Sequence, residues 1–511
     1  MDNAKVTRRL CTDRTGHDCG TLRALTVLTL AGLLAGCVAG PDFRRPALPD
    51  AAAYTAVPWP AQTASAATAF GGTQRLVEGA TISDRWWREL GSPDLDALID
   101  DALKASPTLA SAQATLRQAQ EVHAAQAGST RYPQVDGGIG AQRQRSSPAT
   151  LGQAGDAREF SLYNASVGVH YNLDLAGSNR RALEALSARA DYRRYQLEGA
   201  RLTLVANIVT TAITQARLAA QIQATQTLLS GQEEQLNLSR ERVRLGQGAP
   251  DDVLALQTLV EQTRSGIPLL RKQRQQSEHL LAVLAGLPPG ARELPTFTLA
   301  DFILPSDLPL VVPSELARRR PDIQGAEALL HAANAEYGVA VAKLYPQLNL
   351  SANFGSQALG TGALFGSGSA VWSLVAQLTQ PLFNAGLPAE KRAALAAFDT
   401  AAANYQSVVL ESLRNVADVL AALDNDVQSL AALAAADAAA QKSVESMQRQ
   451  YALGAASYVQ LLTAQQQAQQ SRINLIAAQA QRIADSAALY QALGGGWIEP
   501  LVARESEPDD S

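Results

Sequence analysis

The sequence has little cysteine, few aromatic side chains and no long apolar run, and each shortage excludes a class of protein. Its 3 cysteines, Cys11, Cys19 and Cys37, all precede residue 38 of the 511. A disulfide framework or a cysteine-based metal site therefore cannot stabilise the body of the chain. The clearest apolar run outside that body is Ala24–Gly36. It is shorter than the roughly 20 residues of a transmembrane helix, so no such helix is predicted.

The sequence also lacks a large excess of positive or negative charge. The 43 basic residues nearly balance the 48 acidic ones, and the formal net charge is -5. Nothing global therefore favours binding to nucleic acid. Hydrophobic residues make up 47% of the chain and aromatic residues only 5%. The apolar share is mostly Ala and Leu, and Gln is abundant, which together favour long helices and exclude a disordered chain.

The amino terminus has the pattern of a secretory signal. Basic residues precede the apolar run, and the run ends in Leu34-Ala35-Gly36-Cys37, which looks like the lipobox of a bacterial lipoprotein. We therefore expect cleavage before Cys37, which would carry a diacylglyceryl group and an N-acyl chain; an ordinary buried cysteine is the alternative. The residue directly after Cys37 is Val38 and not Asp. By resemblance to lipoprotein sorting in Gram-negative bacteria, this residue implies the outer membrane.

An internal repeat spans most of the chain. Tyr132-Pro133 recurs as Tyr345-Pro346, and later pairs share an offset of roughly 208 residues. These pairs are Leu245 with Leu453, Gln257 with Gln465, Arg264 with Arg472, and Gly286 with Gly494. The pattern predicts a tandem duplication, roughly 106–286 and 320–494. In each copy we expect a helix of about 25 residues, two strands, a very long helix, a glycine turn and a shorter helix.

The predicted strands alternate between apolar and polar residues. They are expected at about 134–145, 160–175, 346–358 and 370–383, and the alternation is clearest in the second and third. This pattern is typical of outer-membrane barrels, although a half-buried soluble sheet remains the alternative. Four strands cannot close a barrel around a lumen, and open edges are not tolerated in lipid. Several chains must therefore share one barrel if these strands span a membrane.

The long helices carry coiled-coil patterns. The segments 177–246 and 386–454 are each expected to form a helix of about 65 residues, roughly 100 Å long. In the second, apolar residues recur in steps of three and four from Leu395 to Leu430. That spacing predicts a coiled-coil seam, and a ring of such helices would enclose a space.

Three stretches carry a resemblance to a known family. They are Cys37–Pro46, Trp86–Leu95 and Pro313–Glu327 with the later Tyr345-Pro346. The chain resembles the TolC-like and OprM-like outer-membrane channels of tripartite efflux pumps, in their lipoprotein branch. The resemblance implies a mainly α fold with a membrane β-barrel part. In such a homotrimer, four strands from each chain form a 12-stranded barrel, continued into the periplasm by a 12-helix α-barrel.

The same resemblance implies a function and partners. The chain would be the exit duct of an RND-type efflux system, conducting small molecules passively. Its partners would be a periplasmic adaptor protein, an inner-membrane RND pump and outer-membrane lipid, with no cofactor beyond the acyl chains on Cys37. Type I protein secretion and a non-conducting coiled-coil scaffold lipoprotein remain the alternatives.

The resemblance also implies sites at the two helix-hairpin turns. These turns would dock the adaptor, and their residues are Leu245, Gly246, Gln247, Gly248, Leu453, Gly454, Ala455 and Ser457. The periplasmic-tip gate would involve Asp252 and Tyr451. At two further gate positions that are acidic in the family, this chain has Gln460 and Thr463. We therefore expect no acidic cation-binding ring and weaker block by multivalent cations.

Nothing in the motifs indicates an enzyme. His123, His170, His279 and His331 have no metal-ligand spacing, and no phosphate loop or nucleophile elbow occurs. The sequence thus predicts six segments along the chain. They are a signal peptide at 1–36, an extended strap at 37–80, a first repeat at 81–286, a linker at 287–319, a second repeat at 320–496 and an acidic tail at 497–511.

Overall fold

A computed structural model describes residues 38–47, 53–55, 59–147, 152, 154–291 and 293–496. The predicted signal peptide, Cys37 and the acidic tail lie outside the described residues. The chain divides into two compact units. We call them the sheet unit, which comprises 38–43, 122–187 and 331–399, and the helical unit, which comprises 44–121, 188–330 and 400–496.

Each repeat has the same order of elements, a helix, two strands and two helices. The first contains α3 (Pro107–Arg131), β2 (Gln134–Ser146), β3 (Arg158–Leu173), α4 (Ser178–Arg244) and α5 (Pro250–Leu284). The second contains α7 (Pro321–Ala342), β5 (Gln347–Ala358), β6 (Ala370–Thr379), α8 (Gly386–Ala452) and α9 (Tyr458–Ala492). Both α4 and α8 have 67 residues, and both α5 and α9 have 35. The predicted duplication is therefore confirmed.

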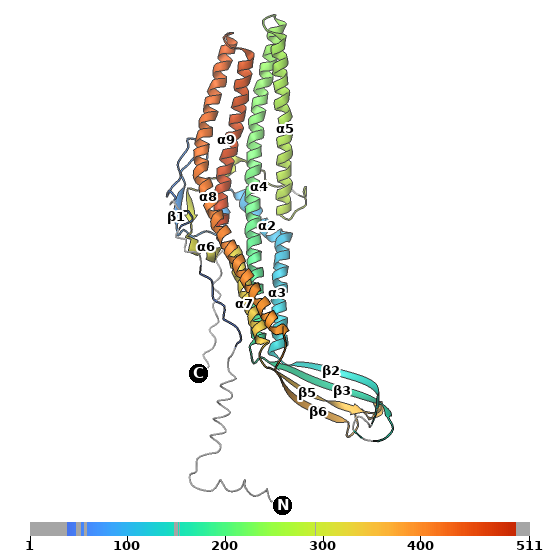
Figure 1. The fold of residues 1–511 in the computed structure, drawn as a ribbon. Helices are drawn as coiled ribbons and strands as arrows, with labels where there is room; N and C mark the ends of the chain where they lie inside the picture. Colours follow the sequence, from blue (N-terminus) through green and yellow to red (C-terminus); the bar gives the residue numbers. More distant parts are fainter. Residues whose placement is uncertain are drawn as a thin grey trace, which may run out of the picture. The chain divides into compact units, whose positions relative to one another are not determined.

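The sheet unit contains one antiparallel sheet with the order β2-β3-β5-β6, seen in Figure 1. All four predicted strands are present, but two end early. β3 ends at Leu173, and β6 ends at Thr379 instead of reaching residue 383. Pro381 follows β6 closely, and proline cannot donate a hydrogen bond to a neighbouring strand. β2 and β6 are left as the two edges of the sheet.

One face of this sheet is apolar across its width. Val167 pairs with Phe354, and Phe354 pairs with Trp372, so the three side chains form one row. Their exposed fractions are 49%, 67% and 78%. A continuous face of large, exposed apolar side chains indicates a surface that contacts lipid or another protein.

The helical unit packs α4, α5, α8 and α9 side by side, as Figure 1 shows. Arg264 and Arg472, which are equivalent in the two repeats, each form an ion pair between a shorter helix and its longer neighbour. Arg264 pairs with Glu233 on α4 at 2.6 Å, and Arg472 pairs with Asp437 on α8 at 3.3 Å. Each hairpin therefore has an interhelical ion pair from the equivalent arginine, although Asp437 lies one helical turn before Gln441, the repeat equivalent of Glu233.

The main core lies where short elements pack on the long helices. The 3-10 helix Trp86–Leu90 precedes α2 (Pro93–Ala105), and the Trp86 ring stacks on Tyr490 of α9 at 5.5 Å. Trp87 is also buried, and its indole Nε1 donates to Asp96 at 2.8 Å. The tryptophan pair is thus a packing anchor of the helical unit.

The predicted strap and linker contain strands and helices that their sequences do not predict. β1 (Arg75–Glu78), within the strap, pairs in parallel with β4 (Asp307–Leu310), within the linker. Arg75 and Asp307 are register partners and form an ion pair at 2.7 Å. The linker also includes the 3-10 helix Leu299–Asp301 and the helix α6 (Pro313–Arg319). β1, β4 and α6 are therefore part of the helical unit, whereas residues 38–43 of the strap belong to the sheet unit.

Most of the predicted seam of α8 is buried from Tyr405 onwards, with Leu413 partly buried, whereas Leu395 is 42% exposed. One helix in the described part of the chain, α4, is long and apolar enough to cross a membrane by length and composition alone. The prediction that no such helix exists is wrong by that criterion. However, 61% of its most apolar window is buried, as expected of a core helix.

Candidate functional site

The two hairpin turns have the same backbone design. Gly246 and Gly454 both adopt the left-handed conformation, with φ of 70° and 72°. In the first turn Gln247 N donates to Arg242 O, and in the second Ala455 N donates to Gln450 O, both at 2.8 Å. These bonds close a helix end in a Schellman arrangement, where glycine avoids the strain of a side chain.

Exposed apolar groups stand at the apex of both turns. Leu245 is 55% exposed and its repeat equivalent Leu453 is 84% exposed. Nearby Leu254 and Val459 are 62% and 69% exposed. Gly248 packs close to Val243, since an added Cβ would lie 3.2 Å from its Cγ2. The turns therefore combine tight backbones with a surface suited to apolar contact.

The structure brings the two predicted gate residues into one electrostatic environment. Burial raises the pKa of the Tyr451 hydroxyl, the charge of Asp252 raises it further, and that of Arg242 lowers it. The Tyr451 ring also packs edge-on against Tyr458 at 5.6 Å. A pocket of about 150 Å³ lies beside them, lined by both tyrosines, Arg242 and apolar residues of α4, α5 and α9.

The side chains of Gln460 and Thr463 form hydrogen bonds with neighbouring residues at the start of α9. Gln460 completes a capping box: its Oε1 accepts from Ser457 N at 2.8 Å, and Ser457 Oγ accepts from Gln460 N at 3.4 Å. The Thr463 hydroxyl donates to Val459 O at 2.9 Å. Ser457, one of the predicted turn residues, is therefore the N-cap of α9.

Arg242 and Tyr458 were not predicted from the sequence. Tyr458 is 5% exposed, and its hydroxyl has no hydrogen-bond partner among the described residues. A signal for Tyr458 existed, because an aromatic residue follows the capping Ser457 at the start of a helix. Arg242 gave no such signal, since basic residues are common in the last turn of any helix.

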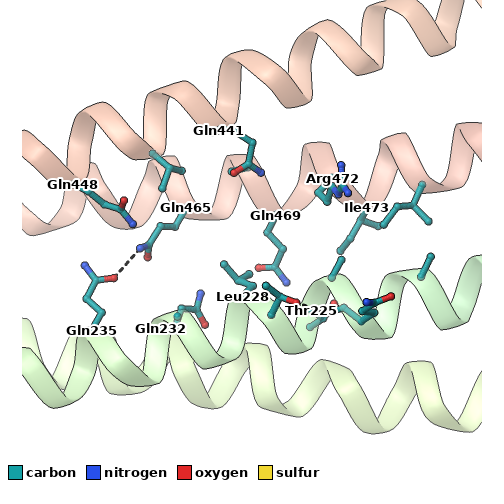
Figure 2. Close-up of a pocket in the computed structure, with 18 of the residues that line it drawn as sticks. Thr225, Leu228, Gln232, Gln235, Gln441, Gln448, Gln465, Gln469, Arg472 and Ile473 are labelled. Carbon is teal, nitrogen blue, oxygen red and sulfur yellow. Dashed lines mark hydrogen bonds between the residues drawn. The ribbon is translucent and has the colours of Figure 1, made fainter. Parts of the chain in front are cut away.

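Glutamine side chains line a larger pocket between α4, α8 and α9, of about 600 Å³ (Figure 2). Gln465 of α9 donates to Gln235 Oε1 of α4 at 2.8 Å, and Gln441 and Gln448 of α8 point toward α4 in the same view. Arg472 is the one charged residue in this lining. The wall is therefore polar and nearly neutral, and it offers little that would select a ligand by charge.

The residues that follow Cys37 are firmly held in the sheet unit. Ala39 N donates to Ala176 O at 2.8 Å, between β3 and α4. Arg181, near the start of α4, has a side chain only 5% exposed and donates to Asp42 Oδ1 at 2.7 Å and to Ala39 O at 3.2 Å. His331 of α7 stacks on Phe43 at 4.4 Å. Position 38 is thus fixed beside the helix-connected end of β3.

No group of three or more His, Cys, Asp or Glu side chains that could hold a metal ion occurs within the described ranges. The histidine contacts seen are structural, since His331 Nε2 lies 2.8 Å from Glu184 Oε1.

The sequence is similar to that of known outer-membrane proteins over both repeats. Residues 98–287 and 312–495 match the family described as "Outer membrane efflux protein". The chain is 33% identical to the pyoverdine export outer membrane protein OpmQ of Pseudomonas putida, covering 82% of this chain and 89% of that protein. It is 31% identical to the probable efflux pump outer membrane protein TtgC of the same species, covering 94% and 96%.

Solved structures agree. The outer-membrane channel OprN matches with a TM-score of 0.81 at 26% identity, covering 90% of this chain and all of that chain. The outer membrane protein VceC of Vibrio cholerae matches with a TM-score of 0.74 at 25% identity, covering 81% and 99%.

Proposed function

Because the chain belongs to the outer membrane efflux protein family, we propose that three copies of it form the exit duct of an RND-type tripartite efflux system. Its role as the outer-membrane component of an efflux system follows from its relatives. The fold class predicted from the sequence is confirmed, since solved relatives such as OprN are outer-membrane channels of the same fold. These relatives are named as channels and outer membrane proteins, and the outer membrane is where such proteins act.

The observation that carries the proposal is the incomplete sheet. Its four strands leave β2 and β6 as free edges, and its apolar face is exposed. In lipid, each unpaired backbone group costs several kcal/mol, so the edges must pair with strands of other copies. Three copies would supply twelve strands, enough to surround a water-filled lumen while the apolar face contacts lipid.

The two hairpin turns would dock the adaptor. Leu245 and Leu453 present exposed apolar groups at equivalent places, and exposed apolar patches mark surfaces that another protein covers. The gate would lie beside these turns, where Tyr451, Asp252 and Arg242 share one charged environment. Gln460 and Thr463 already have local hydrogen-bond partners, which supports the expectation of weak block by multivalent cations.

The lipid would attach next to the strands. Arg181 and Ala176 hold residues 39–42 beside the end of β3, so a diacylglyceryl group on Cys37 would be close to the barrel's periplasmic rim. This placement supports acylation at Cys37, and the barrel and the acyl chains together give lasting attachment.

The duct would conduct passively. The glutamine-rich pocket between α4, α8 and α9 offers little charge for selecting a cargo, and relatives bear names as different as pyoverdine export and toluene efflux. We therefore propose small organic molecules as cargo, chosen by the pump and adaptor.

Conductance of purified trimers in planar bilayers tests the duct. We expect discrete pores, whose open time increases when adaptor is added. Failure to form pores with adaptor present would reject the proposal. Mass spectrometry of wild type and Cys37→Ala tests the anchor separately, because only wild type should gain the mass of three acyl chains.

A further inference from the structure

We propose that Arg143 and Arg145, at the loop end of β2, form a binding site for phosphate-bearing lipid head groups on the outer side of the sheet. The inference rests on the proposed function, because it takes the apolar face of the sheet as the lipid-facing one. It adds a lipid contact, on residues outside the turns, the gate and the anchor.

The strand register puts both arginines on the apolar face. Side chains alternate between the two faces of a strand, so Val135, Ile139, Arg143 and Arg145 share one face of β2. Val135 is paired with Val169 of β3, which lies on the same face as Val167 of the apolar row. The arginines therefore lie on the apolar face of β2, beyond its last large hydrophobic residue, Ile139.

Their position along the strand corresponds to the edge of a bilayer. β2 begins soon after α3 ends at Arg131, so Gln134 marks the helix-connected end and Ser146 the loop end. From Val135 to Arg143 the strand rises about 27 Å. With the usual tilt of barrel strands this is about 20 Å of membrane depth, close to the height of the apolar band. Both guanidinium groups would therefore lie at the head-group level, where a charge on the lipid face is tolerated.

The local charge balance leaves the site positive. Glu159 is the register partner of Arg145, and its carboxylate lies 3.4 Å from Arg143 Nη2 and 3.9 Å from Arg145 Nη1. One carboxylate is thus shared by two guanidinium groups, whose side chains are 76% and 69% exposed. Each arginine has five N–H donors in a planar fork that matches phosphate oxygens in pairs. A phosphate would complete the hydrogen bonding that one carboxylate supplies only in part.

The occupant is a lipid and not free phosphate, because the site continues the apolar band. A lipid can place its acyl chains on Ile139 and the neighbouring apolar side chains while its phosphate reaches the arginines. Since β2 is an edge strand, the proposed trimer would present three such sites, each at a junction between two copies.

Lipid retention in nanodiscs tests the site. Trimers are placed in phosphatidylcholine with a minor fraction of phosphatidic acid, and native mass spectrometry measures which lipid stays bound. We expect wild type to enrich phosphatidic acid, and Arg143→Gln with Arg145→Gln to lower this enrichment about fivefold for each arginine removed. Replacing both with lysine should keep part of it, because the charge remains but the planar fork is lost.

Arg158→Gln is the matched control. Arg158 pairs with Ser146 at the same strand end but lies on the opposite face, so its loss should leave enrichment unchanged. Equal enrichment in wild type and the double glutamine variant would overturn the inference, as would an equal loss in R158Q. Release of phosphatidic acid by millimolar inorganic phosphate would overturn the lipid assignment. Conducting trimers without enrichment would reject only this site, whereas absence of pores would reject the duct.

Discussion

Gln465 donates a hydrogen bond from its Nε2 to Gln235 Oε1 at 2.8 Å, and this bond joins the two helix hairpins of one chain (Figure 2). Gln465 belongs to α9 and Gln235 to α4, so the bond connects the two repeats. It lies between the hairpin turns and the middle of the helical unit, and Gln465 is 5% exposed. Separation of the hairpins would have to break this bond.

We predict that Gln465→Ala favours the open channel. Loss of a mostly buried hydrogen bond typically costs about 1 kcal/mol, which is roughly a fivefold shift in an equilibrium between joined and separated hairpins. Open probability of single trimers in planar bilayers measures the effect. Gln470→Ala is the control, because Gln470 bonds to Asn474 on its own helix. An unchanged open probability in Q465A would show that the bond does not restrain the hairpins.

Asp426 of α8 makes stability depend on pH. Burial and, after it, the nearby carboxyl group of Asp485 raise the pKa of its carboxyl to about 7, against the opposing charge of Arg482. The folded state therefore holds this proton more tightly than the unfolded chain does. The contribution of Asp426 to the free energy of unfolding is therefore fully present below the ordinary pKa of aspartate. It is lost as pH rises from about 4 to about 7.

We therefore predict that the wild-type protein unfolds at a lower temperature at pH 8 than at pH 5. The expected loss is on the order of 1–2 kcal/mol, after allowing for solvent screening at this half-buried site. Asp426→Asn should remove most of this slope and raise stability at pH 8, and Asp485→Asn should reduce it. Thermal unfolding across this pH range measures the slope. An equal slope in D426N would exclude Asp426 as its source.

Two glycine substitutions should have opposite effects. Gly454 has φ of 72° and an added Cβ would meet nothing within 4 Å, so Gly454→Ala carries backbone strain alone. We expect a loss of about 1 kcal/mol. Gly231 lies inside α4, also with open space around it. Gly231→Ala should therefore stabilise the chain by about 0.5–1 kcal/mol. Chemical denaturation of both variants compares them, and equal signs would contradict the assignment of the left-handed turn.

Arg181 should control the order of the segment that follows Cys37. Its buried guanidinium donates to Asp42, to Ala39 O and to Gly40 O. Arg181→Ala would leave these acceptors without their donor, at a local cost of about 3 kcal/mol. Hydrogen exchange of residues 38–42 should accelerate by about two orders of magnitude. Arg180→Ala is the control, because Arg180 is 53% exposed in its side chain. Equal protection in R181A and wild type would exclude this anchoring role.

Local rules were sufficient for the elements and the turns. The two 67-residue helices, the four strands and the turns at Gly246 and Gly454 follow from periodicity and from glycine's access to the left-handed region. The repeat offset was likewise visible in the printed residues. The strand count also indicated that one chain could not close a barrel, because an unpaired edge is too costly in lipid.

Contacts between distant residues were decided only by the tertiary structure. β1 pairs with β4 across more than 200 residues, and both lie in segments that read as an extended strap and a Pro-rich linker. Arg482 is fully buried and donates to Gly72 O at 2.9 Å, although its sequence context is that of an ordinary helix surface. Gln465 meets Gln235, and Tyr451 meets Tyr458, because helix packing sets which faces touch. The sequence by itself determined the repeated pattern of helices, strands and turns, since these depend on near neighbours. Folding decided which polar groups are buried together, since that depends on the free energy of packing the whole chain.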